Sequence, residues 1–261
     1  MSTGTNEPQH ILILGASGAS GLTFIKHHLS LPDSDASKPY LTLYIRTSAR
    51  SKLASVLPSS SAPTNSDTPA PRIRIIEGAL TDKAALLRAL SADPTISFLK
   101  PTAVISLLGA YMSLYHFLTR TTPTPIADAF RSTIVPALRE SGVRRVLVLS
   151  TPSAFPVPGE YESMSWGRWL LKLIPLIAIP QGAAEMKGIA NAVIGVEGLE
   201  ATVFRVPFLT DEEGPKEVEA GVIGQGFVDA SSLARESMVR WLIKELDEKR
   251  WVGGAPLLCN P

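Results

Sequence analysis

Residues 10–24, HILILGASGASGLTF, decide the fold that we predict for this chain. The apolar run from His10 to Leu14 predicts a buried strand, and Leu22 to Leu31 predict the helix that follows it. The glycine-rich turn between them allows the backbone to turn tightly and to lie close to a bound group. The positive amino terminus of the helix would then attract an anion such as a pyrophosphate.

The spacing of the glycines narrows the kind of turn. Gly15, Gly18 and Gly21 lie three residues apart, whereas a GxGxxG motif would require glycine where Ser17 stands. A P-loop would require Lys followed by Ser or Thr after the last glycine, whereas Leu22 and Thr23 follow it here. A GxSxG nucleophile elbow does not fit either. Two alternatives are left: a dinucleotide-binding turn, or a plain structural turn between a strand and a helix.

Beyond this stretch, predicted strands and helices alternate along the chain. We expect further strands at residues 40–46, 73–79, 102–110, 143–150 and 201–209, and helices at 50–57, 82–90, 126–141, 183–195 and 231–248. This alternation predicts an α/β protein with a Rossmann-type, doubly wound parallel sheet. Residues 1–261 are expected to form one such domain, with a small cap over the strand ends from 111–120, 153–180 and 209–228.

The composition excludes several classes of protein. Hydrophobic residues make up 45% of the 261 residues and charged residues 19%, which excludes an intrinsically disordered chain. The net charge of +1 gives no reason to expect a nucleic acid or an anionic membrane as a partner. The single Cys259 excludes a disulfide framework and a multi-cysteine zinc site, and we expect no metal.

The apolar segments of the chain are short. The longest, Trp169 to Pro180, has 12 residues and contains Lys172, whereas a membrane-spanning helix needs about 20 apolar residues. Residues 1–10 contain no Lys or Arg, and the apolar run after them is too short for the core of a signal peptide. We therefore expect a cytoplasmic protein.

The end of the second predicted strand indicates which dinucleotide would bind. Arg46 stands there, followed by Thr47, Ser48 and Arg50. Asp or Glu at this place would bind the free 2′-hydroxyl of NAD, whereas a guanidinium with neighbouring hydroxyl groups suits the 2′-phosphate of NADP. We expect NADP(H) to be the preferred cofactor. The alternative is that Arg46 is merely a solvated residue at a strand end.

Six short motifs occur in an order that is typical of one family. They are GASGASG (15–21), the Arg46 turn, EGALTD (77–82), SLLGA (106–110), LSTPSAF (149–155) and RVP (205–207). With these motifs the chain resembles the atypical short-chain dehydrogenase/reductase superfamily, in its NmrA-like and biliverdin-IXβ-reductase-like branch. The resemblance extends over most of the chain and implies a fold that binds NAD(P).

The resemblance also implies which residues contact the cofactor. The pyrophosphate and the adenosine phosphate would be bound by Gly15, Ser17, Gly18, Ala19, Ser20, Gly21 and Arg46. The adenine would contact Ala79 and Leu80, although relatives often have Asp in place of Ala79. The ribose would lie over Leu107, Leu108, Gly109 and Ala110, and the nicotinamide would lie beside Ser150, Thr151, Ser153, Pro207 and Phe208. The side chains of Leu107, Leu108 and Val206 are themselves expected in the sheet core.

The usual catalytic pair of this family is incomplete. Many members have Tyr-x-x-x-Lys, in which the Lys lowers the pKa of the Tyr and orients the ribose. Here Lys187 lies on the corresponding helix, but Ala183 occupies the Tyr position, and none of the five tyrosines stands four residues before a Lys. Lys187 would bind the ribose or act alone, unless it is simply a solvated helix residue.

Five other side chains are candidates for supplying a proton. They are the hydroxyl groups of Ser150, Thr151, Ser153 and Tyr161, and the imidazole of His116. We expect all of them at the carboxyl edge of the sheet, where ligands bind in this architecture. The alternative for the Ser and Thr hydroxyl groups is a hydrogen bond to the backbone. The alternative for Tyr161 and His116 is ordinary packing.

Three functions are compatible with these residues. The first is a reductase that transfers hydride from NADPH to a small, apolar, conjugated substrate, which is quinone-like, flavin-like or an intermediate of specialised metabolism. Aromatic residues of the expected cap, such as Tyr111, Trp166 and Phe227, suit such a ligand. The second is a non-catalytic redox sensor, which the missing Tyr favours, and the third is a redox-neutral isomerase or cyclase. The only partner expected is the substrate, and a monomer and a homodimer are both compatible.

Overall fold

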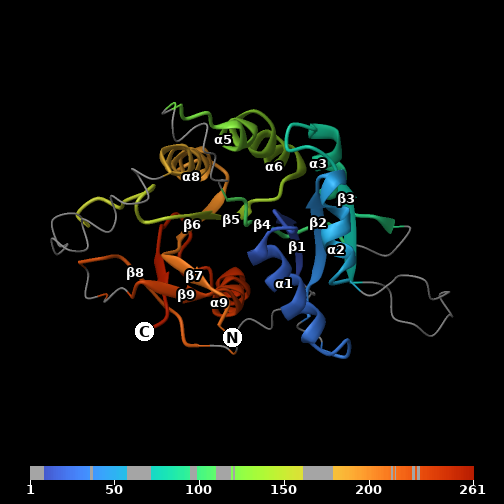
Figure 1. Cartoon of the computed structure of the whole chain (residues 1–261). Helices are drawn as coiled ribbons and strands as arrows, with labels where there is room; N and C mark the ends of the chain where they lie inside the picture. Colours follow the sequence, from blue (N-terminus) through green and yellow to red (C-terminus); the bar gives the residue numbers. More distant parts are fainter. Residues whose placement is uncertain are drawn as a thin grey trace, which may run out of the picture.

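A parallel sheet forms the centre of the computed structural model (Figure 1), which describes residues 9–35, 38–57, 72–94, 99–109, 119, 121–160, 179–212, 214, 216–224, 227 and 230–261. The eight strands lie in the order β3-β2-β1-β4-β5-β6-β10-β8. All neighbouring strands are parallel except β8, which pairs antiparallel with β10. This confirms the predicted Rossmann-type, doubly wound α/β fold.

Of the six predicted strands, the first has its predicted bounds and the other five are shorter than predicted. The strands of the sheet are β1 (His10–Leu14), β2 (Tyr40–Ile45), β3 (Ile73–Glu77), β4 (Ala103–Ser106), β5 (Arg145–Ser150), β6 (Glu200–Arg205), β8 (Glu219–Gly221) and β10 (Leu257–Cys259). Every residue of β1, β4 and β5 is buried. This burial explains their nearly continuous apolar sequences, since helices cover both faces of the sheet.

The predicted strand at 201–209 is in fact two strands. The break falls at Val206 and Pro207, because proline has no N–H to continue a sheet ladder. After the break, β7 (Phe208–Thr210) pairs in parallel with β9 (Ser232–Ala234) in a separate two-stranded sheet. The chain therefore leaves the main sheet at its carboxyl edge.

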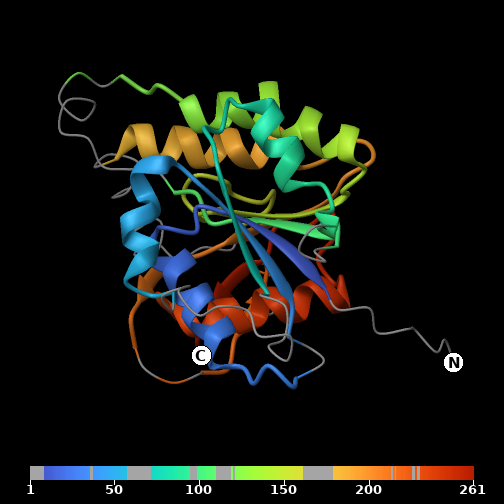
Figure 2. The same cartoon turned by 90° about the vertical axis from the view of Figure 1, so that its right-hand side faces the viewer.

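Two layers of helices enclose the sheet, as Figure 2 shows. On one face, α1 (Ala19–Ser30) lies beside α9 (Arg235–Glu248). The other face is covered by α3 (Lys83–Ala89), α5 (Pro125–Ala129), α6 (Val135–Ser141) and α8 (Pro180–Val193). The 3-10 turn η1 (Thr47–Ala49) and the short helix α2 (Arg50–Ala54) follow β2.

The helix expected at 126–141 contains a π-helical stretch, η3 (Phe130–Ile134), between α5 and α6. The N–H of Val135 donates to the carbonyl of Phe130, five residues back. Pro136 follows at once and has no N–H to offer the preceding turn, so the widened turn accommodates it. Gly142 then ends α6 with a φ of 71°, in the left-handed region that glycine adopts without strain.

Some local predictions differ from the structure or lie beyond it. Asp82 caps α3 by accepting a hydrogen bond from the N–H of Ala85 at 2.9 Å, so the helix begins at Lys83, one residue later than predicted. α9 begins at Arg235 because β9 occupies the preceding residues, which were predicted to be helical. Among the predicted site residues, Ala110, His116 and Tyr161 lie outside the described residues, as does most of the expected cap segment 153–180.

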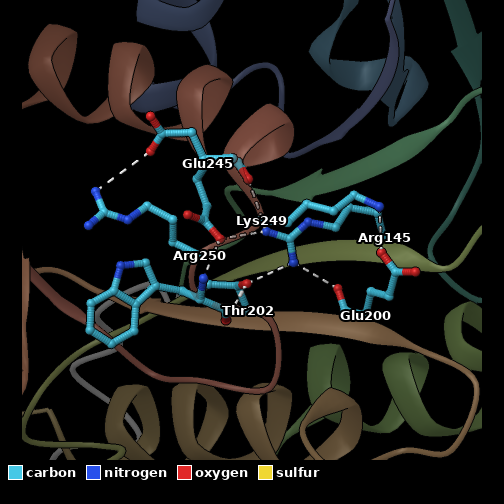
Figure 3. Close-up of polar contacts among 8 residues, drawn as sticks. Arg145, Glu200, Thr202, Glu245, Lys249 and Arg250 are labelled. Carbon is cyan, nitrogen blue, oxygen red and sulfur yellow. Dashed lines mark hydrogen bonds and ion pairs between the residues drawn. The ribbon is translucent and has the colours of Figure 1, made fainter. Parts of the chain in front are cut away.

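A buried ion pair ties α9 to the amino ends of β5 and β6 (Figure 3). Arg145 donates from Nη2 to Oε1 of Glu245 at 2.8 Å, and from Nη1 to the Thr202 hydroxyl at 2.8 Å and the Glu200 carbonyl at 2.9 Å. The same Glu245 oxygen accepts the N–H of Trp251 at 2.8 Å. Burial lowers the pKa of Arg145, while the Glu245 carboxylate opposes that change.

We expect Glu245→Ala to lower the free energy of unfolding by about 3–5 kcal/mol, because it leaves the buried Arg145 guanidinium without its counter-charge. Urea unfolding followed by tryptophan fluorescence measures the loss. Glu248→Ala is the matched control on the same helix: among the described residues, Glu248 pairs only with the exposed Lys244 and Arg250, at 3.6 and 3.8 Å. The control should change stability by less than about 1 kcal/mol. Equal effects of the two variants would contradict this account.

Candidate functional site

The glycine turn lies where β1 and β4 meet in the middle of the sheet. Gly15 follows β1 with a φ of +85°, and a Cβ on it would lie 3.0 Å from the carbonyl carbon of Leu107 and from the nitrogen of Leu108. The loops after β1 and β4 are therefore in close backbone contact. From β1 the next strands in sequence, β2 and β3, lie on one side, while β4, β5 and β6 lie on the other. Such a switch point is where doubly wound sheets bind their ligands.

The amino terminus of α1 is open to an anion. Gly18 is the N-cap residue, no side chain of the described residues caps it, and the first turn has no acidic residue. The first N–H groups of a helix have no intrahelical acceptor, and the helix dipole is positive there. Gly18 and Ala19 are exposed and Ser17 is half-buried. These residues fit a pyrophosphate.

The three glycines differ in what limits them. A Cβ on Gly21 would lie 2.5 Å from the carbonyl oxygens of Gly15 and Ala16, so the packing of the chain itself requires glycine. A Cβ on Gly18 would lie 3.4 Å from the Gly15 oxygen, which is an ordinary contact. The space above Gly18 is thus left open by the protein and is available to a ligand.

The residues expected at the 2′-phosphate lie together at the carboxyl edge. Arg46, Thr47, Ser48 and Arg50 are all exposed and follow β2 directly. Arg50 forms an ion pair with Glu77, the last residue of β3. The Arg50 guanidinium and the Thr47 hydroxyl, through their hydrogen bonds, hold the pKa of Glu77 below its ordinary value. The sequence analysis did not single out Glu77, and only its place in EGALTD signals it.

The loop after β3, where the adenine residues were predicted, is fixed by a tyrosine. Tyr44 donates from its hydroxyl to the carbonyl of Ala79 at 2.7 Å. Burial raises the pKa of Tyr44 to about 12, so it remains a donor at neutral pH. A Cβ on Gly78 would lie 2.2 Å from this hydroxyl, which explains the glycine. Ala79 is exposed and Leu80 half-buried.

The loop after β4 continues the same edge. The N–H of Leu107 donates to the Leu14 carbonyl at 2.9 Å. The Leu107 side chain is buried in the core, as is that of Val206, while Leu108 and Gly109 are half-buried. The backbone of this loop, rather than its side chains, therefore faces the switch point.

The hydroxyl groups at the end of β5 bond within the protein. Ser150 is fully buried and donates to the carbonyl of Met186 at 3.3 Å. Thr151 accepts the N–H of Ala154 at 3.2 Å, and its hydroxyl lies 3.2 Å from that of Ser153. Lys187, next to Met186 on α8, is exposed and has no ion-pair partner among the residues that the structure describes. The structure thus brings the β5 hydroxyls and the helix of Lys187 together.

A buried carboxylate on α8 holds the start of α5. Glu185 is 1% exposed and accepts the N–H groups of Ile126 and Ala127, each at 2.9 Å. The sequence analysis missed this contact, although Glu185 lies four residues before the buried Ile189 and so on the same face of the helix. Through these two hydrogen bonds, α8 fixes the position of the start of α5.

Comparison with known proteins identifies the family. The model of the NAD(P)H-binding family matches residues 41–249. The chain belongs to the NAD(P)H-binding family. The match begins after the glycine turn, so the turn and the family match are independent observations. No curated protein is significantly similar to the chain in sequence.

Several solved structures share the fold. A short-chain dehydrogenase/reductase from Veillonella parvula DSM 2008 in complex with NADP is 20% identical, with a TM-score of 0.62 over 97% of this chain and 95% of that chain. The anaerobillin reductase ChuY from Escherichia coli O157:H7 is 15% identical, with a TM-score of 0.63 over 97% and 98%. The family match confirms the NAD(P)-binding family that the resemblance implied, and these likenesses show the same Rossmann-type fold.

One aromatic side chain of this NAD(P)H-binding protein is openly exposed at the same edge. Phe208, the first residue after Pro207, is 76% exposed, while its N–H donates to the carbonyl of Ser231 at 3.1 Å.

Among the described residues, no group of His, Cys, Asp and Glu side chains could hold a metal ion. Nor is any helix of the described chain long and apolar enough to cross a membrane.

We expect Gly18→Asp to abolish binding of the dinucleotide while the chain still folds. The Cβ has room, but the carboxylate would stand where a phosphate has to approach the N–H groups of α1. Isothermal titration calorimetry measures the affinity, and thermal unfolding checks the fold. Lys26→Asp, exposed two turns along the same helix, is the control and should leave the affinity unchanged. Affinity retained within a few-fold in Gly18→Asp would place the pyrophosphate elsewhere.

Proposed function

We propose that the chain is an NADPH-dependent reductase that transfers hydride to a small, apolar, conjugated substrate. The open amino terminus of α1 beneath Gly18, at the switch point of the sheet, is the observation that carries this proposal. The membership in the NAD(P)H-binding family supports it, as does the NADP bound to the similar fold from Veillonella parvula. The exposed basic cluster after β2 supports NADP over NAD.

The cofactor would be held along the whole carboxyl edge. In this proposal the turn from Gly15 to Gly21 binds the pyrophosphate, and the 2′-phosphate lies at Arg46, Thr47, Ser48 and Arg50. The loop at Ala79 and Leu80 borders the adenine, the loop from Leu107 to Ala110 borders the ribose, and Ser150, Thr151, Pro207 and Phe208 border the nicotinamide. When bound, the reduced nicotinamide supplies the hydride. Lys187 would contact the ribose from α8.

The substrate would bind between this edge and the cap. We assign the cap to residues 111–120, 153–180 and 209–228 of a single NAD(P)-binding domain, residues 1–261. The exposed Phe208 offers a flat apolar surface against which a conjugated ring would stack. A neighbouring fold is named an anaerobillin reductase, which agrees with reductase chemistry on this scaffold.

The proton would come from solvent. Ala183 stands where the family usually has Tyr, and the hydroxyls of Ser150 and Thr151 are already engaged with the protein. General acid catalysis by a positioned side chain contributes about 10²–10⁴-fold. A conjugated acceptor spreads the incoming charge and tolerates the loss of that contribution, whereas an isolated ketone concentrates the charge on one oxygen. His116 and Tyr161 are the alternative donors.

A redox sensor is the second candidate function. The same engaged hydroxyls and the Ala183 position favour it, because a sensor needs the cofactor but no proton donor. Turnover separates the two functions: a sensor binds NADPH without oxidising it in the presence of any acceptor.

We expect the chain to oxidise NADPH with quinones or flavins as acceptors and to show almost no oxidation with isolated ketones. The loss of absorbance at the nicotinamide band measures the rate. Ser150→Ala, Thr151→Ala and Ser153→Ala should each lower turnover about tenfold or less, because a neutral hydrogen bond contributes about 0.5–1.5 kcal/mol. NADPH binding without oxidation across the whole panel would favour the sensor.

Tyr161→Phe tests the source of the proton. We expect it to change turnover by less than about tenfold, since solvent supplies the proton in this proposal. The dissociation constant of NADPH, measured in parallel, serves as the control. A thousandfold loss of turnover with unchanged NADPH affinity would identify Tyr161 as the acid and contradict the solvent route.

A further inference from the structure

A carboxylate occupies the place next to the proposed 2′-phosphate site. Glu77 contacts Nη1 of Arg50 and is hydrogen-bonded by the Thr47 hydroxyl. Two of the four residues proposed to hold the phosphate are therefore engaged by one acidic side chain. The Glu77 side chain is 26% exposed and that of Arg50 is 68% exposed, so a ligand arriving from solvent reaches both.

The backbone fixes Glu77 in this position. Glu77 ends β3 and pairs in register with Ile45, the residue directly before Arg46. The N–H of Gly78 donates to the Ile45 carbonyl at 2.9 Å, which holds the two strand ends together. Since neighbouring strands lie about 4.8 Å apart, the carboxylate cannot move far from the basic residues after β2.

We propose that Glu77 is a specificity-determining residue that competes with the 2′-phosphate of NADPH for Arg50 and Thr47. This inference rests on the proposed function. A phosphate that binds here has to break the Glu77 contacts and then lie near a like charge, which opposes it. NADH has no 2′-phosphate and leaves the pair intact. Glu77 therefore reduces the preference for NADPH and allows the chain to bind both dinucleotides.

The depressed pKa of Glu77 agrees with this role. The carboxylate is held ionised by Arg50 and Thr47 well below neutral pH, so the competing charge is present under ordinary conditions. Arg46 and Ser48 follow β2, as Arg50 does, and both are exposed. They are the residues left to attract the phosphate while Arg50 is paired.

The experiment measures dissociation constants of NADPH and NADH by isothermal titration calorimetry, so it requires no substrate. Glu77→Gln keeps the shape of the side chain and removes its charge. We expect it to tighten NADPH binding about fivefold at low salt and to change NADH binding less than about twofold. The gain should shrink at high ionic strength, where exposed charges are screened.

Glu236→Gln is the matched control. Glu236 is similarly exposed, at 31%, and pairs with Arg240 on α9 at 3.1 Å. The control should leave both dissociation constants unchanged. Arg50→Ala should weaken NADPH binding, and adding Glu77→Gln to it should give little further change, because the competition requires Arg50.

The outcomes separate this inference from the proposed function. Wild-type chain that binds neither dinucleotide would overturn the proposed function. NADPH binding that is unchanged or weaker in Glu77→Gln, with wild-type binding intact, would overturn only the role of Glu77. Thermal unfolding verifies that the variant is folded, and Glu77→Ser, which also removes the charge, should shift the NADPH affinity in the same direction.

Discussion

The close contact between Gly15 and the backbone of Leu107 and Leu108 is the constraint on which the site depends. A side chain at residue 15 would meet a carbonyl carbon and an amide nitrogen at 3.0 Å, and its φ of +85° is itself unfavourable for any residue with a Cβ. With glycine there, β1 and β4 lie as neighbours and the backbones that follow them stay in close contact. The amino terminus of α1 follows directly from this turn, at the switch point of the sheet.

The loops at this carboxyl edge of the sheet are held by hydrogen bonds that occupy polar side chains. Tyr44 fixes the Ala79 carbonyl, Ser150 bonds to Met186, and Thr151 accepts the Ala154 N–H. Each bond makes a strand end rigid but leaves one fewer hydroxyl for chemistry. This is the physical reason that the backbone and the cofactor, rather than a set of side-chain acids, dominate the proposed site.

The parts of this arrangement that depend on local sequence were predictable. The apolar runs of the six predicted strands, the glycine turn and the end of α6 at Gly142 all follow from local sequence patterns. The starts of helices were less predictable from the sequence. Thr81 and Asp82 are both good capping residues, and only the structure shows that Asp82 caps α3. Pro207 was visible in the sequence, yet the predicted strand ran through it to Leu209.

The contacts that the sequence could not show are those between distant charges. Glu77 pairs with Arg50, which lies 27 residues away in the sequence. Glu185 accepts a hydrogen bond from Ile126 at the start of α5, 59 residues away. No spacing rule connects such partners, because the fold has to form before they meet. The sequence does reveal a buried acid on an apolar face, as at Glu185, but not what it binds.

Two buried ion pairs hold the opposite ends of β6 by the same means. Arg145 and Glu245 join α9 to the amino ends of β5 and β6. At the carboxyl end of β6, Arg205 makes two hydrogen bonds to Glu160, at 2.6 and 2.7 Å, and a third to the Ala255 carbonyl at 2.8 Å.

Both members of the Arg205–Glu160 pair are fully buried, so the desolvation of the charges is offset only if every hydrogen bond forms in one arrangement. Glu160 also accepts the N–H groups of Val157 and Ile223, at 2.9 and 3.3 Å. It therefore joins the loop after β5 to the segment after β8. Arg205 lies three residues before Phe208, so this one pair fixes both the point where the chain leaves for the proposed cap and the exposed aromatic side chain that the substrate would meet.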